Sequence, residues 1–199
     1  MKKVLLTGFE PFHKASSNPT QEIVRIIESE KLTNVKTLVL PVEFGKSGQI
    51  ACEAIDDFKP DVVLALGQAE GRSDITPEKI AINLDHARIP DNARKMPNNA
   101  AIIQGGPDGL FSTLPVEDMV TALQMENLPA SISFSAGTFV CNNLFYLIQF
   151  HCKGKSINSG FVHIPLMESQ ASEFPGFPTL SFEAMLNAIR IIIVEVQRQ

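Results

Sequence analysis

Cys141 and His163 are the residues whose type and position most favour enzyme chemistry. Cys141 follows a turn at residues 135–138 and opens an apolar segment with helical spacing. The unpaired N–H groups at a helix N-terminus favour the thiolate, which is the nucleophilic form of cysteine. The same N–H groups can stabilise an oxyanion. Because free cysteine is also common as a small buried apolar residue, this context alone leaves a structural role for Cys141 open.

The other two cysteines are weaker candidates. Cys52 lies in the middle of an expected helix, and Cys152 lies at a polar helix end. Three cysteines without a CxxC spacing favour reduced thiols in a cytoplasmic protein over a disulfide framework or a zinc site.

His163 lies in the segment FVHIP, at the carboxyl end of an expected strand. In parallel α/β sheets, active sites gather beyond the carboxyl ends of the strands. A histidine satisfied within the core is the alternative interpretation, and His13, His86 and His151 compete for a catalytic role.

A carboxylate that orients the imidazole would complete a triad. Glu78, at the start of an expected strand, is suitable. Asp74, Asp85 and Asp91 are equally suitable by chemistry, and triad members meet in space and not in sequence, so spacing leaves this choice open.

Strands and helices alternate along the chain and predict an α/β fold, with a largely parallel sheet and helices on both faces. The first helix is expected to begin with Asn18 as its cap and Pro19 at its first position, and the C-terminal helix with Ser181 as its cap. Residues 88–110 are expected to form an excursion or a pair of short strands, and residues 168–180 a loop. Expected strands cover residues 4–6, 35–40, 61–66, 78–84, 130–134 and 159–164, and expected helices cover residues 19–31, 44–58, a segment starting at 115, 139–151 and 181–196.

Length and composition predict a single domain over residues 1–199. The net charge of −5 argues against nucleic acid as a partner. The chain contains no apolar run of the ~20 residues that would cross a membrane, and the N-terminal apolar stretch is too short for a signal peptide.

GxGxxG, GxxxxGK[ST], HExxH and GxSxG motifs are absent from the sequence. The residues alone therefore indicate an α/β domain with a candidate Cys-His site.

Four segments, in this order, carry a resemblance to one family. They are residues 6–12 (LTGFEPF) with Asn18-Pro19, residues 67–83 (GQAEGRSDITPEKIAIN), residues 88–92 (RIPDN), and residues 135–142 (SAGTFVCN) followed by 161–165 (FVHIP). Through them the chain resembles pyroglutamyl peptidase type I, or pyrrolidone carboxyl peptidase, over nearly its whole length.

The resemblance implies a cysteine peptidase that removes N-terminal pyroglutamate from peptides. It implies a triad of Cys141, His163 and Glu78. It also implies a three-layer α/β/α sandwich with a mixed, largely parallel central sheet, no metal or organic cofactor, and often a homotetramer. The residues it places around the substrate are Phe9, Phe12, Asn18, Gln68, Arg88, Ile89, Phe139 and Val140.

Two departures from the family pattern lie near the expected substrate. His13 and Lys14 follow Phe12 where the family usually has small glycines, and Glu70 stands where glycine is common. Two alternatives therefore stay open: a catalytically silent binding homologue, and a nucleoside phosphorylase-like transferase that needs phosphate and no thiol.

Overall fold

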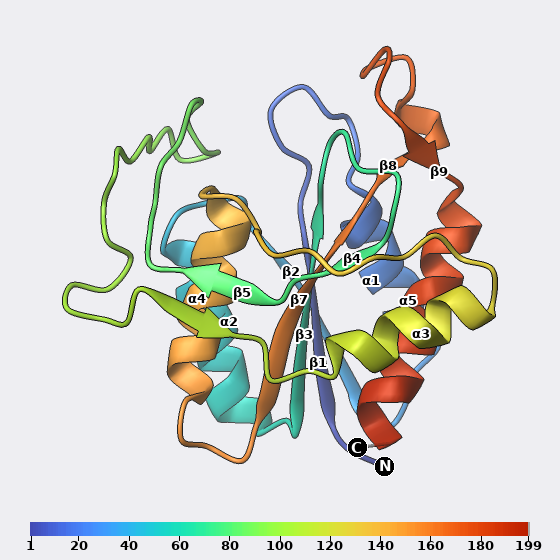
Figure 1. The fold of residues 1–199 in the computed structure, drawn as a ribbon, viewed down its shortest axis with the longest axis horizontal. Helices are drawn as coiled ribbons and strands as arrows, with labels where there is room; N and C mark the ends of the chain where they lie inside the picture. The colour runs from blue at the N-terminus through green and yellow to red at the C-terminus, as the bar shows by residue number, and fades with distance from the viewer. Residues whose placement is uncertain (199) are drawn as a thin grey trace.

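The computed structural model describes residues 1–198. Its centre is a five-stranded sheet in the order β2-β1-β3-β7-β4 (Figure 1). β1, β2, β3 and β7 are parallel, whereas β4 runs antiparallel to β7. The prediction of a mixed, largely parallel sheet is therefore confirmed. The bounds of these strands are Val4–Phe9 (β1), Val35–Leu40 (β2), Val62–Gln68 (β3), Thr76–Pro77 (β4) and Asn158–Ile164 (β7).

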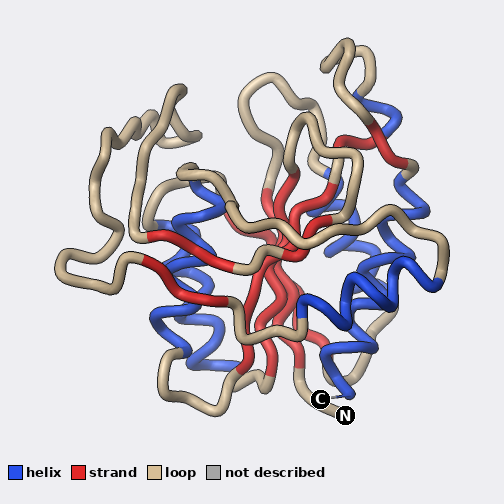
Figure 2. Tube along the Cα trace, viewed as in Figure 1, coloured by secondary structure: helices blue, strands red, loops and turns tan. Residues whose placement is uncertain are grey.

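Helices cover both faces of the sheet and complete three layers (Figures 1 and 2). One apolar core joins α1, α3 and α5 to the sheet, and the other joins α2 and α4 to the opposite face. β1 and β3 are apolar apart from Thr7 and Gln68, because they are buried on both faces along almost their whole length. The helices are α1 (Pro19–Ser29), α2 (Lys46–Phe58), α3 (Val116–Met125), α4 (Val140–Cys152) and α5 (Phe182–Arg198).

Two small sheets and a short 3₁₀ helix lie outside the central sheet. β5 (Ile80–Ile82) pairs with β6 (Gly109–Phe111), and β8 (Leu166–Met167) pairs with β9 (Thr179–Leu180). The 3₁₀ helix η1 (Glu168–Gln170) follows β8 directly. None of the helices in residues 1–198 has the length and apolar character needed to cross a membrane.

The helix starts follow local chemistry. Asn18 caps α1 by accepting a hydrogen bond from the Thr20 N–H at 3.0 Å, and Pro19 is the first helical residue. Ser181 accepts a hydrogen bond from the Ala184 N–H at 3.2 Å, three residues into the C-terminal helical segment. Both caps were expected from the sequence. α2 begins at Lys46, after Gly45 with a positive φ of 77°, and not at the expected Phe44.

Two predicted strands are wrong. Of the expected strand 78–84, only Ile80–Ile82 forms a strand, β5, and it pairs with β6; β4 lies before it, at Thr76–Pro77, and pairs with β7. The expected strand 130–134 makes only two isolated bridges, Ala130 with Ile75 and Ser133 with Glu78. Its neighbouring segment contains Pro77, which has no N–H and therefore interrupts a regular ladder. The expected loop 168–180 is also more ordered than predicted, because it contains η1 and ends in β9.

Candidate active site

A small cavity lies at the carboxyl ends of β1 and β3. The chain leaves β1 for one face of the sheet and β2 for the other, so this is the topological switch point where α/β proteins bind ligands. The cavity has a volume of about 80 Å³. It is lined by Phe9, Phe12, Asn18, Val42, Gln68, Glu70, Phe139 and Cys141.

Glu78 and His163 form a buried hydrogen-bonded pair. The Glu78 Oε1 to His163 Nδ1 distance is 2.6 Å, and both side chains are almost completely buried. His163 is the second-last residue of β7. Glu78 is held beside it because its N–H donates to the Phe161 carbonyl at 2.8 Å. Of the four carboxylates that sequence spacing left open, Glu78 is therefore the one that the fold places on this imidazole.

Cys141 lies in the first turn of α4, as expected. Phe139, the N-cap residue of α4, contributes no side-chain hydrogen bond, so no side chain from this position occupies the N–H groups of the first turn. These N–H groups lie next to the sulfur and can donate to an oxyanion.

The sulfur of Cys141 lies over the end of β3, next to β7. A Cβ atom on Gly67 would be only 3.0 Å from Cys141 Sγ and 2.7 Å from the Phe161 ring. Gly67 pairs with His163 in the parallel ladder, and paired residues direct their side chains to the same face of the sheet. Cys141 and His163 therefore share one face at the carboxyl end of the sheet, and the missing side chain of Gly67 makes room for the thiol.

Burial dominates the protonation of this site. Burial, with a smaller contribution from the Glu78 charge, raises the pKa of the Cys141 thiol to about 12, and Arg72 and a backbone hydrogen bond only partly oppose this. Burial also lowers the pKa of His163, although Glu78 opposes this shift. At neutral pH the resting pair is therefore a thiol and a neutral imidazole. The expected preference of the helix N-terminus for a thiolate is outweighed by desolvation.

Glu78 remains ionised despite its burial. Burial alone raises the pKa of this carboxyl, but the hydrogen bond from His163, the nearby Ser133 hydroxyl and the charges of His163 and Arg72 lower it overall. Arg72 Nη1 lies 2.7 Å from Glu78 Oε1, and Arg72 Nη2 donates to the Ser135 carbonyl at 3.0 Å. Arg72 is part of a segment that carries the family resemblance, but no sequence pattern indicated its contact with Glu78.

Five of the eight predicted substrate residues line the cavity together with Cys141: Phe9, Phe12, Asn18, Gln68 and Phe139. The rings of Phe12 and Phe139 are 5.1 Å apart between centroids. The other three lie elsewhere. The Val140 side chain is fully buried in the core, and Arg88 and Ile89 are exposed in the irregular segment between β5 and β6.

The polar wall of the cavity contains residues with different tasks. The Asn18 amide is occupied by structural bonds, because it accepts from Thr20 and donates to the Glu10 carbonyl at 3.1 Å. Val42 and Glu70 also line the cavity but were not among the predicted substrate residues.

His13 has a left-handed φ of 57°, a conformation that glycine adopts without steric cost. This explains why a glycine would suit the position that follows Phe12.

Comparisons with known proteins agree with this architecture. A family model described as "Pyroglutamyl peptidase" matches residues 2–199. A pyrrolidone-carboxylate peptidase of Vibrio vulnificus is 45% identical over 196 residues, covering 98% of this chain and 92% of the relative. A second relative of the same name, from Vibrio campbellii, is 42% identical over 194 residues, covering 96% of this chain and 91% of the relative.

Two solved structures are similar over nearly the whole chain. The crystal structure of pyroglutamyl peptidase I from Bacillus amyloliquefaciens superposes with a TM-score of 0.95 at 38% identity, covering 100% of this chain and 98% of that one. A mutant pyrrolidone carboxyl peptidase from P. furiosus superposes with a TM-score of 0.93 at 37% identity, covering 99% of each chain.

Proposed function

The chain belongs to the pyroglutamyl peptidase family, and we propose that it removes N-terminal pyroglutamate from peptides with Cys141, His163 and Glu78 as its catalytic residues. One observation carries the assignment of these residues. A buried carboxylate holds an imidazole at 2.6 Å, on the same sheet face as the Cys141 thiol, which lines the cavity. A nucleophile, a base and a carboxylate that orients the base are the three parts of such an acyl-transfer site.

The first chemical step follows from the resting protonation states. His163 takes the thiol proton as the sulfur attacks the carbonyl carbon that joins pyroglutamate to the next residue. Proton transfer and attack belong to one step because the raised pKa of Cys141 keeps the thiolate scarce beforehand. Glu78 fixes the tautomer of His163 and stabilises the imidazolium that forms.

The tetrahedral intermediate places a negative charge on the former carbonyl oxygen. N–H groups in the first turn of α4 stabilise this oxyanion. The intermediate then collapses as the C–N bond breaks, and the imidazolium of His163 protonates the leaving amine. Water, deprotonated by His163, attacks the thioester and releases pyroglutamate and the free thiol.

The cavity suits the chemistry of pyroglutamate, the residue that would be removed. Pyroglutamate is a flat, uncharged lactam without a free α-amino group, so a selective site needs apolar walls and a few polar contacts. Phe9, Phe12 and Phe139 provide the walls, and Gln68 provides an amide. The small volume of about 80 Å³ suits a single small ring.

The test is hydrolysis of a chromogenic pyroglutamyl amide without added metal. We expect turnover by the wild type and a loss of at least about a thousandfold in Cys141→Ser. Cys52→Ser is the matched control, because Cys52 is a half-buried cysteine on α2 outside the cavity. The control should retain wild-type activity.

The other outcomes separate the alternatives. A folded wild type that binds the substrate without turnover would indicate a silent homologue. Phosphate-dependent activity that survives Cys141→Ser would indicate a phosphorylase-like transferase instead. A prolyl amide turned over as fast as the pyroglutamyl amide would contradict the proposed pocket, because proline lacks the lactam carbonyl and carries a charged amine.

A further inference from the structure

Gln170 is a fully buried amide that touches the wall of the cavity from behind. It ends η1, directly after β8, and its side chain has no exposed surface. Its Oε1 accepts from the Met167 N–H at 2.9 Å. Its Nε2 donates to the Ser17 carbonyl at 3.1 Å and to Gln68 Oε1 at 3.0 Å.

These three bonds fix the direction of two amides in succession. A backbone N–H can only donate and a backbone carbonyl can only accept, so Met167 and Ser17 determine which end of the Gln170 amide is oxygen and which is nitrogen. The Gln170 nitrogen then faces Gln68, so the Gln68 oxygen must be the acceptor of this hydrogen bond. The Gln68 nitrogen is consequently directed away from Gln170.

The Gln68 nitrogen is the donor that this arrangement leaves available. Among residues 1–198, Gln68 Nε2 makes no hydrogen bond, whereas its Oε1 is occupied. Gln68 is also a lining residue of the cavity. A cavity built in this way offers an amide N–H and rejects a ligand that presents its own donor at the same place.

Resting on the function proposed above, we propose that Gln170 is a positioning residue for substrate selectivity. It holds the Gln68 amide so that Nε2 donates to the carbonyl oxygen of the lactam ring. If the Gln68 amide were reversed, its oxygen would face the lactam oxygen, and two acceptors would oppose each other without a proton between them. Selectivity for the lactam is therefore set by a residue that does not itself line the cavity.

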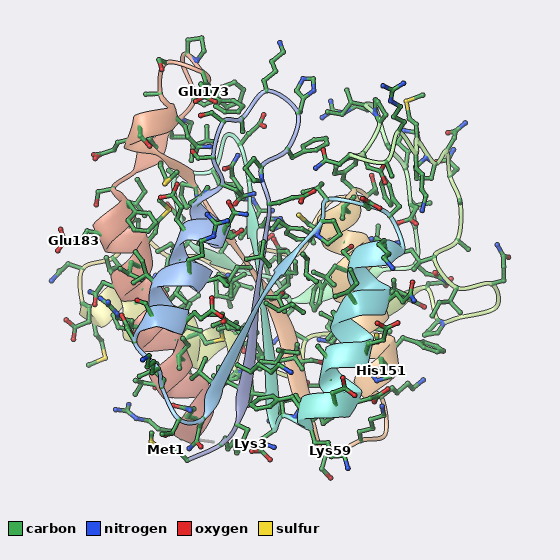
Figure 3. All side chains as sticks on the ribbon, turned by 180° about the vertical axis from the view of Figure 1, so that it is seen from behind. Met1, Lys3, Lys59, His151, Glu173 and Glu183 are labelled. Atoms are coloured by element: carbon green, nitrogen blue, oxygen red, sulfur yellow. The ribbon has the colours of Figure 1, made fainter. Side chains whose placement is uncertain are left out.

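A purely structural role for Gln170 makes a different prediction. Gln170 also holds Ser17, in the loop between β1 and α1 that carries Phe12 and Asn18. The same loop has a second, independent tie, because Ser16 donates to the Glu173 carboxylate from its N–H at 2.9 Å and from its hydroxyl at 2.6 Å. Glu173 lies at the loop-bearing end of the molecule (Figure 3). Glu173→Ala therefore loosens the loop without touching Gln68.

The experiment compares two substrates with the same chromogenic leaving group: a pyroglutamyl amide and a cyclopentanecarbonyl amide, whose ring has the same size but no lactam. The ratio of their kcat/KM values measures lactam selectivity. In Gln170→Glu the side chain can still accept from Met167 but has no N–H, so the Gln68 amide must reverse. We expect the ratio to fall at least about tenfold, mainly through a higher KM for the pyroglutamyl substrate.

Control variants make the outcomes distinct. Glu173→Ala should keep the wild-type ratio even if both rates fall. Gln68→Met should lower the ratio as strongly as Gln170→Glu, and adding Gln170→Met to it should lower the ratio no further. If Gln170→Glu does not fold, Gln68→Met and the neutral Gln170→Met still decide the matter.

Two results would overturn the proposal. An unchanged ratio in a folded Gln170 variant or in Gln68→Met would remove this pair from lactam recognition while leaving the peptidase assignment intact. A wild type that does not hydrolyse the pyroglutamyl amide at all would instead overturn the proposed function, and the selectivity role with it.

Discussion

Glu78 Oε1 accepts from His163 and from Arg72 at the same time, at 2.6 Å and 2.7 Å. The guanidinium lowers the pKa of both His163 and Cys141, in each case opposing the effect of the Glu78 charge. Arg72 thus offsets the charge of the carboxylate that orients the base. It also fixes the Ser135 carbonyl in the turn that precedes α4.

Replacing Arg72 should change the pH dependence of catalysis. A cation near an imidazole disfavours the imidazolium, so in Arg72→Gln the pKa of His163 rises. His163 must be neutral to act as a base, and the acid limb of the kcat/KM profile should therefore move to higher pH. At the optimum we expect a loss of about tenfold, or about 1.4 kcal/mol.

Arg72→Lys provides the conservative comparison, because it keeps the charge but not the simultaneous contact with Glu78 and the Ser135 carbonyl. Its acid limb should stay close to that of the wild type even where its rate is lower. The measurement is kcat/KM for the pyroglutamyl amide across the pH range. An acid limb that does not move in Arg72→Gln would show that Arg72 has no electrostatic effect on the base.

At the scale of elements, the close contact between β1 and α1 shapes one wall of the cavity. Gly8 lies on β1 directly under the first turn of α1, and a Cβ atom there would be 2.5 Å from the Thr20 carbonyl oxygen. Thr20 also accepts from the Phe9 N–H through its hydroxyl, at 2.8 Å. This close contact and this hydrogen bond hold the start of α1 against the end of β1, beside the cavity that Phe9 lines.

Gly8→Ala should destabilise the protein because the atom it meets belongs to the backbone and cannot rotate away. We expect a loss of about 2–3 kcal/mol in the free energy of unfolding, measured by urea denaturation. Glu28→Ala, on the exposed side of α1, should stay within about 0.5 kcal/mol of the wild type. Wild-type stability of Gly8→Ala would mean that β1 and α1 can separate at little cost.

At the scale of the whole molecule, Asp85 links the segment between β5 and β6 to α4 and, through Asn143, to the start of α2. Its Oδ2 accepts from Asn143 on α4 at 2.8 Å, and Asn143 Oδ1 accepts from the Gly45 N–H before α2 at 3.0 Å. Burial raises the pKa of Asp85 from 3.8 to about 6, and the hydrogen bond from Asn143 opposes this shift only in part. The carboxyl therefore ionises less readily in the folded protein than in the unfolded chain.

This shift predicts a stability that depends on pH. Because the folded pKa is raised, the folded state binds the proton more tightly, and Asp85 costs stability as pH rises from about 4 through 6. Asp85→Asn should remove this cost, about 1–3 kcal/mol between pH 4 and pH 7.5. The measurement is the free energy of unfolding against pH, with Asp57→Asn, an exposed residue, as control. An identical pH slope in wild type and Asp85→Asn would contradict the prediction.

The sequence by itself determined most of the elements and indicated Cys141 and His163 as the candidate reactive side chains. Continuous apolar runs identified β1 and β3, because strands buried on both faces need apolar residues at every position. Asn18 and Ser181 marked helix starts, because a cap acts within a few residues of itself. Cys141 and His163 were found for the same reason, since a helix start and a strand end are local features.

Tertiary structure alone decided which residues meet. Glu78 and His163 are 85 positions apart; residue chemistry and spacing left Glu78 level with three other carboxylates, the family resemblance selected it, and the antiparallel pairing of β4 with β7 is what brings it to the imidazole. The contact of Arg72 with Glu78 and that of Gln170 with Gln68 likewise depend on packing between loops. Desolvation also reversed the expected thiolate preference of Cys141, because the helix N-terminus acts locally whereas burial depends on every neighbour that the fold brings to the sulfur.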